Sequence, residues 1–326
     1  MNWKTMTLLA AFALSVNAAD TKTYKIAMIA KSSTNPVFLS ARTGAEAAAK
    51  ELSAKHGINI VIDWRTPPTE DGQVQAQRLA QAVNEGADAI LISCSDAGKV
   101  TGAINDAVAR GVAVMTFDSD APASKRFAYY GVDDVETGGQ VMSELAKLMN
   151  GKGSIAILAG NQNATNLRRR TEGVKKEAGN HHGIKIVDTF YNIETPQDAA
   201  AEVVRVMKAY PEIEGWAMVG AWPLFTKTLL TDLDPGKVKL VAVDALPAEL
   251  PYVEKGIAPV LLAQPTYQWG YVSVEKIIEK IHLKKDVPVI NKMELVRVTK
   301  ESLGSWARQL KAWGFTDVPE EYLKLP

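Results

Sequence analysis

The sequence has little of the chemistry that holds small or metal-dependent folds together. Cys94 is its only cysteine, so no internal disulfide can form and the fold must depend on its cores. The stretch "AILISCSD" around it predicts a buried thiol at a strand end. A length of 326 residues, 47% of them hydrophobic, fits one large α/β domain or two lobes. The histidines lack ligand spacing, which predicts no zinc site: His56, His181, His182 and His282.

An excess of charge of either sign is also missing. Lys plus Arg number 37 and Asp plus Glu number 37, so the formal net charge is zero. No general field therefore favours nucleic acid or anionic lipid. We expect a neutral partner and no nucleic acid.

Long hydrophobic runs are absent beyond the first residues. Met1 and Lys4 precede the apolar "MTLLAAFALSV", and "VNA" at 16–18 offers small residues at the usual cleavage spacing. We interpret residues 1–19 as a signal peptide that is removed. A retained membrane anchor is disfavoured because the stretch is shorter than the ~20 residues that span a bilayer. No cysteine follows to accept a lipid, so we expect a soluble protein outside the cytoplasm.

Several enzyme motifs are absent as well. The stretch "AKSSTNPVF" after the first expected strand is neither G-x-G-x-x-G nor a P-loop, which disfavours nucleotide cofactors. No G-x-S-x-G elbow occurs, and no histidine follows a strand to act as a base. A carboxylate pair of Asp118 with Asp120 or Asp244 leaves a glycosidase as an alternative from another class.

What the sequence does contain is a regular alternation of short β-branched runs and longer helical patterns, from residue 24 to the mid-290s. This alternation is typical of βαβ units and parallel sheets. It includes an expected helix over 223–233. Two successive runs of such units predict an α/β fold of two similar doubly wound parallel-sheet lobes. The expected parts are an N-terminal lobe of residues 22–132 plus 265–292, a C-terminal lobe of 133–264 plus 293–300, and a surface tail of 301–326 with a short amphipathic helix.

Polar and aromatic side chains follow the expected strands. Ligands of open parallel sheets bind at the carboxyl ends of the strands, so these residues are the candidates for a site. Their planar donors and acceptors suit the hydroxyls of a sugar, and charge-assisted hydrogen bonds are about twice as strong as neutral ones. Phe38, Tyr191, Trp222 or Trp64 could cover the C–H face of such a ligand. The polar candidates are Lys31, Asn35, Asp118, the stretch from Asn161 to Arg170, Asp244 and Gln264.

Structural alternatives exist for these residues. Asp118 and Asp244 could form turns or cap helices, and Asn35 before Pro36 is a turn signal. Phe38 and Trp222 could belong to the cores, where aromatic residues are common. The residues alone leave both interpretations open.

The stretches together resemble the sugar-binding proteins of ABC importers in the ribose/galactose-binding family, which share their fold with LacI-type repressor domains. "KIAMIAKSSTNPVF" is similar to the family's first strand with its Asn-Pro-x-Phe turn. "GVAVMTFDSDAP" is similar to its strand with the sugar-binding aspartate. "RRRTEGV", "LVAVDALP" and "VLLAQPTYQWGY" resemble its later arginine, aspartate and glutamine positions. The resemblance covers nearly the whole mature chain.

The resemblance implies a type I periplasmic binding protein: two lobes joined by a multi-strand hinge that close on a monosaccharide. It implies a periplasmic, non-enzymatic protein that acts as a monomer without cofactors and delivers the sugar to an ABC-type permease, with a chemoreceptor as a further partner. A transcription regulator is disfavoured by the signal peptide and by the lack of a preceding helix-turn-helix. The cleft residues it implies are Asn35, Phe38, Asp118, Arg170, Asp244 and Gln264.

Departures from the ribose pattern bear on the ligand. Val37 replaces a second phenylalanine, Ser119 an arginine, and Glu194 falls near the stacking aromatic. Trp222 could supply the aromatic plate instead. These changes leave open a pentose, a hexose or a deoxysugar. Lys31 and "DSD" also resemble relatives that bind a furanose autoinducer signal, which is the alternative ligand.

Overall fold

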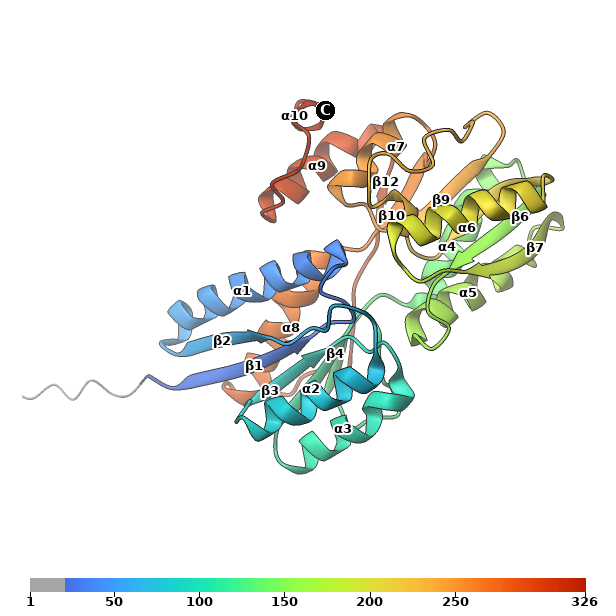
Figure 1. Cartoon of the computed structure of the whole chain (residues 1–326). Helices are drawn as coiled ribbons and strands as arrows, with labels where there is room; N and C mark the ends of the chain where they lie inside the picture. Colours follow the sequence, from blue (N-terminus) through green and yellow to red (C-terminus); the bar gives the residue numbers. More distant parts are fainter. Residues whose placement is uncertain (1–20) are drawn as a thin grey trace, which may run out of the picture.

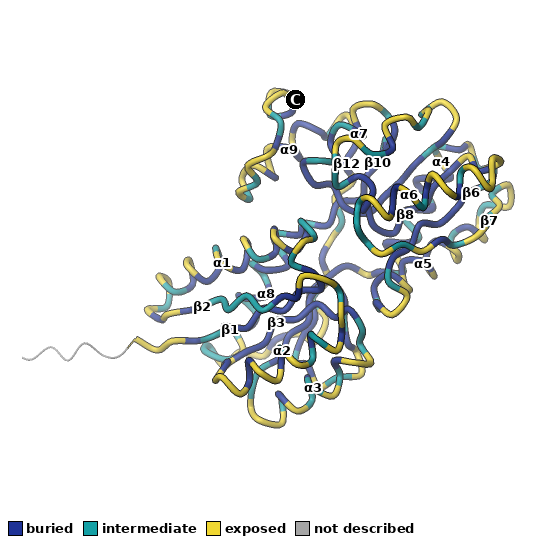
Figure 2. The backbone as a smooth tube through the Cα atoms, in the orientation of Figure 1, coloured by how far each residue is buried: buried dark blue, intermediate teal, exposed yellow. Residues whose placement is uncertain are grey.

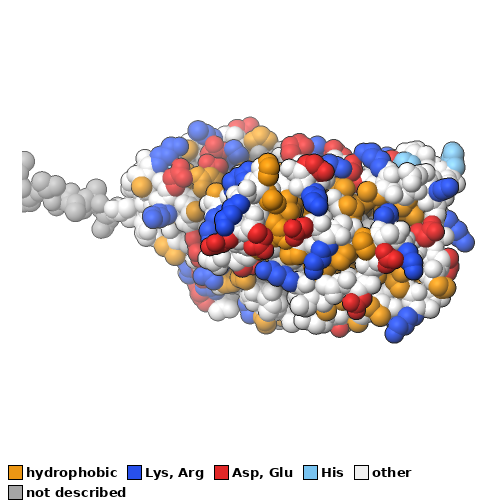
Figure 3. Space-filling model, turned by 90° about the horizontal axis from the view of Figure 1, so that it is seen from above, with side chains coloured by type: hydrophobic (Ala, Val, Ile, Leu, Met, Phe, Trp, Pro, Cys, Tyr) orange, Lys and Arg blue, Asp and Glu red, His pale blue; other side chains and the backbone are white. Residues whose placement is uncertain are grey.

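The computed structural model describes residues 21–326, which form two α/β lobes side by side (Figure 1). The expected signal peptide of residues 1–19 lies outside the described residues. Within the described part, no helix is long and apolar enough to cross a membrane. On the face seen in Figure 3, basic and acidic side chains are interspersed, in keeping with the zero net charge.

The first lobe is built on a six-stranded parallel sheet with the order β11-β5-β4-β3-β1-β2. Alternate residues of β1 face opposite sides: Ile26 and Met28 join the core under α1 and α8, whereas Ala27 and Ile29 join the core under α2 and α3. Both faces are covered, so the inner strands β1, β3, β4 and β5 are buried along most of their length, whereas the edge strands β2 and β11 are partly exposed (Figure 2). The elements are β1 (Thr23–Ile29), α1 (Pro36–His56), β2 (Asn59–Trp64), α2 (Gly72–Asn84), β3 (Ala89–Ile92), α3 (Ala97–Ala109), β4 (Ala113–Phe117), β5 (Ala128–Gly131), α8 (Thr266–Ile281) and β11 (Ile290–Lys292).

The second lobe repeats this plan. Its sheet has the order β12-β10-β9-β8-β6-β7, and only β12 runs antiparallel, beside β10. The elements are α4 (Asp134–Leu148), β6 (Lys152–Ala159), α5 (Thr165–Ala178), β7 (Gly183–Tyr191), α6 (Pro196–Ala209), β8 (Ile213–Met218), η1 (Trp222–Leu224), β9 (Lys239–Val243), η2 (Pro247–Glu249), α7 (Leu250–Glu254), β10 (Val260–Ala263), β12 (Val296–Val298), η3 (Lys300–Ser302), α9 (Leu303–Ala312) and α10 (Glu320–Leu323).

The chain passes between the sheets three times: after β5, after β10, and between β11 and β12. The equal strand order makes β4 of the first lobe the counterpart of β9 in the second. Residues that follow these strands therefore occupy equivalent places in the two lobes.

Two expectations about the second lobe were wrong. The expected helix at 223–233 is only the short η1, followed by turns. Two carbonyls of this segment are bonded by a side chain in place of helical N–H groups: the Tyr252 hydroxyl contacts Thr226 O at 2.6 Å and also Leu229 O. The residues 301–326 are not a surface tail: α9 buries an apolar face in the core of the second lobe, and Trp306 Nε1 donates to Ala245 O at 2.7 Å.

Candidate functional site

Two aspartates stand at equivalent strand ends of the two lobes. Asp118 follows β4 and Asp244 follows β9, and both have a positive φ, 55° and 91°. Non-glycine residues rarely adopt this conformation, and such strain tends to occur at functional sites. Backbone pairing holds each in place, since Asp118 N donates to Tyr130 O and Asp244 N to Leu262 O. Both expected aspartates are thus buried at the strand ends.

Arg170 of α5 connects these aspartates. Its guanidinium donates to Asp134 Oδ1 at 2.9 Å, to Gln264 Oε1 at 2.8 Å and to Val219 O at 3.2 Å. Gln264 in turn donates to Asp244 Oδ1 at 2.9 Å. Arg170 Nη2 lies 3.9 Å from Asp118 Oδ1 in the other lobe.

Asp118 also makes a direct hydrogen bond between the lobes. Its Oδ1 accepts from Asn166 Nδ2 of α5 at 2.9 Å, while its Oδ2 accepts from Ser93 of its own lobe at 2.7 Å. We call the residues gathered here the central cluster: Asp118, Asp134, Asn166, Arg170, Asp244 and Gln264.

Burial sets the ionisation of this cluster. It raises the pKa of Asp134 and of Asp244 to about 6, against the opposing effect of the Arg170 guanidinium. Burial alone would lower the pKa of Arg170, but the surrounding carboxylates outweigh it and the pKa is raised. The arginine therefore stays charged, beside carboxyl groups that can accept or donate hydrogen bonds.

A second group, the peripheral cluster of Lys31, Glu70, Asn161 and Glu194, also joins the lobes. Lys31 Nζ lies 3.5 Å from Glu70 Oε1 of its own lobe and 3.7 Å from Glu194 Oε2 of the other. Asn161 donates from its backbone N to Glu194 Oε1 at 2.7 Å and from Nδ2 across the lobes to Ser95 O at 3.2 Å. Burial raises the pKa of Glu70 to about 8, although Lys31 opposes the shift.

The peripheral cluster borders a cavity of about 590 Å³ between the lobes, the entrance cavity. Glu70 and Asn35 contribute to its wall from the first lobe, and Glu194 and Phe225 from the second. A cavity of this size with a few placed polar groups is typical of small-molecule sites.

Other expected site residues have structural roles. Asn35 caps α1 by accepting from Val37 N at 3.2 Å, and it reaches only the entrance cavity. Phe38 is in the first core, stacked on Trp269 at 6.0 Å, and Trp222 is in the second core. Phe38 also meets Phe117, the residue before Asp118, with ring centroids 6.4 Å apart. A contact of Phe38 or Trp222 with the ligand stays a prediction. Ser119 is fully buried after Asp118, and its hydroxyl has no hydrogen-bond partner among the described residues.

Sequence reasoning missed Asp134 and Glu70, whereas Asn166 lies within the candidate stretch 161–170. Asn166 stands one helical turn before Arg170, so its spacing could have indicated a shared face. Asp120, which offered a carboxylate pair, instead forms an ion pair with Arg126. Within residues 21–326, no group of side chains is arranged to hold a metal ion.

The fold and the site define a class: two doubly wound lobes with a polar cleft between the carboxyl ends of their strands. The family described as periplasmic binding protein domain matches residues 26–285, and the chain belongs to it. This confirms the family and the fold class expected from the sequence, since the relatives named below are sugar-binding proteins of the same fold.

Relatives and solved structures agree with this assignment. The ribose import binding protein of Bacillus subtilis is 27% identical over 48% of this chain and 49% of its own length, so this match spans about half of that relative. The ribose import binding protein of Escherichia coli is 24% identical over 89% of this chain and 97% of its own. A Burkholderia graminis ABC transporter solute-binding protein in complex with D-arabinose is 26% identical, with a TM-score of 0.80 over 87% of this chain and 98% of its own. A chain of the XylFII–LytSN complex is 26% identical, with a TM-score of 0.76 over 85% of this chain and 98% of its own.

Proposed function

We propose that this protein is the solute-binding component of an ABC importer and captures a monosaccharide between its lobes. The observation that carries the proposal is the central cluster, where Asp118 and Asp244 face one guanidinium at equivalent strand ends. Such fixed donors and acceptors match adjacent sugar hydroxyls. The family and the sugar-binding relatives support the same conclusion.

The mechanism follows from contacts that cross the lobes. Asp118 and Lys31 belong to the first lobe, and Arg170, Asp244 and Glu194 to the second. A sugar held by both sets stabilises the closed arrangement relative to the open one. The closed form is the one an ABC-type permease accepts. Export to the periplasm, a monomeric state and a chemoreceptor partner complete the proposal, the last supported by the XylFII–LytSN complex.

A thermal-shift panel of pentoses, hexoses, deoxysugars and polyols tests this function. The cognate sugar should raise Tm, because a ligand at 100 times its Kd stabilises by about 2.7 kcal/mol. In Asp118→Ala the shift should disappear, while circular dichroism shows a folded protein. A sugar shift that persists in this variant would refute the site. Release of reducing sugar from chromogenic glycosides would support the glycosidase alternative.

A further inference from the structure

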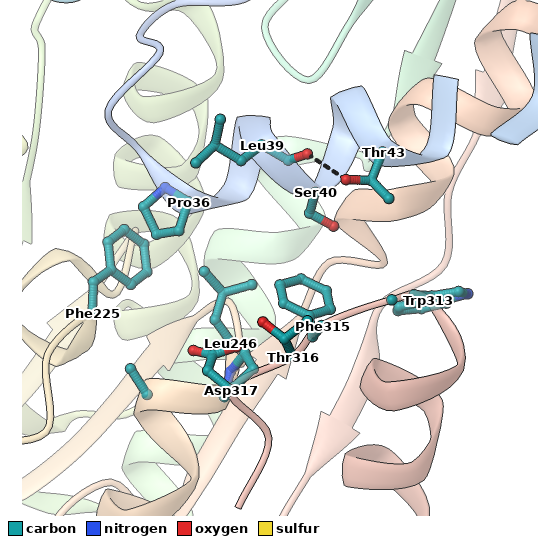
Figure 4. A pocket seen from close by; sticks show the side chains of 13 residues that line it. Pro36, Leu39, Ser40, Thr43, Phe225, Leu246, Trp313, Phe315, Thr316 and Asp317 are labelled. Carbon is teal, nitrogen blue, oxygen red and sulfur yellow. Dashed lines mark hydrogen bonds between the residues drawn. The ribbon is translucent and has the colours of Figure 1, made fainter. Parts of the chain in front are cut away.

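A second cavity, the side pocket, lies between the lobes beside the cleft (Figure 4). Its volume is about 250 Å³. Helix α1 forms one wall, the loop after β9 a second, and the segment 313–317 a third. Its apolar lining comes from both lobes: Pro36, Leu39, Phe225, Leu246, Trp313 and Phe315.

The same loops carry the side pocket and the cleft. Pro36 follows Asn35, and Leu246 stands two residues after Asp244 of the central cluster. Pro36 and Phe225 line both the side pocket and the entrance cavity. The side pocket is therefore next to the cleft.

Aromatic packing fixes the third wall. The Trp313 ring stacks on Tyr267 of α8, with centroids 5.7 Å apart and an interplanar angle of 3°. Trp306 and Trp313 pack edge to face, with ring centroids 5.6 Å apart, and Phe315 packs against the cores of both lobes. The wall is thus held in place by residues of both lobes.

One polar group inside the side pocket has no partner. Ser40 is 5% exposed, and among the described residues nothing hydrogen-bonds its Oγ. In Figure 4 this oxygen points from α1 toward Phe315, whereas the Thr43 hydroxyl is satisfied by Leu39 O at 3.1 Å. Buried hydroxyls are normally paired, so this oxygen is free to hydrogen-bond a ligand atom in the side pocket.

We propose that the side pocket is a subsite of the sugar cleft that accepts an uncharged aryl substituent on the sugar, with a hydrogen-bonding atom of that group on Ser40. The inference rests on the proposed function of the cleft. Apolar cavities of about 150 Å³ already bind benzene, so this space is large enough for one ring. The ring contacts both lobes and favours closure.

Calorimetry with methyl, phenyl and 4-hydroxyphenyl glycosides of D-ribose, D-xylose, D-arabinose and D-glucose tests the inference. For the sugar that binds, the phenyl glycoside should bind at least tenfold tighter than the methyl glycoside. The 4-hydroxyphenyl glycoside should gain a further threefold or more, and this second gain should vanish in Ser40→Ala.

A charge placed at the mouth of the side pocket tests the subsite further, and the same charge on a distant strand is its control. Leu39 on α1 is 45% exposed, and Leu39→Glu should abolish the phenyl gain while the methyl glycoside binds as before. Val61→Glu, at a residue of β2 with 42% exposure outside the side pocket, should change neither. Equal affinity for phenyl and methyl glycosides overturns the subsite alone. If neither the sugars nor the glycosides bind, the proposed function falls, and the subsite with it.

Discussion

Carboxyl groups outnumber cations in the cleft. Asp134 and Asp244 have a pKa of about 6 and Glu70 one of about 8, in each case chiefly because burial penalises the charged form. Lys31 and Arg170 oppose these shifts without cancelling them. The folded protein therefore holds protons that the unfolded chain releases near its ordinary carboxyl pKa.

This difference makes stability depend on pH. A folded pKa above the unfolded one means that ΔG of unfolding falls as pH rises between the two values, by up to about 1.4 kcal/mol per pH unit for each group. We expect ΔG of unfolding to decrease between about pH 4 and 6 because of Asp134 and Asp244, and to decrease further up to about pH 8 because of Glu70. Urea unfolding at a series of pH values measures it.

The variant Glu70→Gln separates the contribution of Glu70 to this pH dependence from that of Asp134 and Asp244. This variant should lose the slope between about pH 6 and 8 and keep, below pH 6, the part of the slope that comes from Asp134 and Asp244, which are unchanged. Glu46→Gln changes an exposed glutamate of α1 that pairs with Arg42, and it should leave the slope unchanged both below pH 6 and between pH 6 and 8. A wild-type protein whose stability is constant from pH 6 to 8 would contradict the role assigned to Glu70.

At the scale of elements, the close contact of α4 and α5 positions Arg170. A Cβ on Gly138 of α4 would lie 1.9 Å from Arg170 O, and one on Gly173 of α5 would lie 2.0 Å from Val135 O. Both clashes are with backbone, so the helices must separate if either glycine gains a side chain. Helix α5 carries Arg170 and Asn166, and both would move with it.

Gly173→Ala should therefore reduce stability and sugar affinity together. Overpacking of this kind costs about 1–3 kcal/mol, and the displaced guanidinium weakens binding at least tenfold. Gly102→Ala in α3 is the matched control, since nothing lies within 4 Å of its Cβ and alanine favours a helix by up to about 1 kcal/mol. Thermal unfolding and calorimetry measure both effects. Unchanged affinity in Gly173→Ala would contradict the role of this contact.

The alternation of apolar runs predicted the sheets well, because parallel strands buried on both faces need such runs. It failed at 223–233, where a tyrosine hydroxyl, rather than helical hydrogen bonds, satisfies the carbonyls. Strand ends correctly indicated Asp118, Arg170, Asp244 and Gln264 as neighbours. Asp134 and Glu70 could not be found this way, since their partners come from distant segments.

At the scale of the molecule, hydrogen bonds between the lobes act together with the ligand. Asn161 Nδ2 donates to Ser95 O at 3.2 Å and to Glu70 Oε2 at 3.4 Å, both in the first lobe. Asn166 likewise donates from the second lobe to Asp118 of the first. These bonds exist only while the lobes touch, so they contribute to the free energy of closure and hence to apparent sugar affinity.

Asn161→Asp tests this coupling. The variant keeps the side-chain oxygen that accepts from Asn163 N, loses the donors to Ser95 and Glu70, and adds a negative charge beside Glu70 and Glu194. Because like charges then oppose closure, we expect sugar affinity to fall at least tenfold and the radius of gyration from X-ray scattering to rise. Asn163→Asp adds the same charge at an exposed neighbour and should change neither the sugar affinity nor the radius of gyration. If both variants bind alike and scatter alike, contacts between the lobes do not govern closure, and the ligand alone must bring the lobes together.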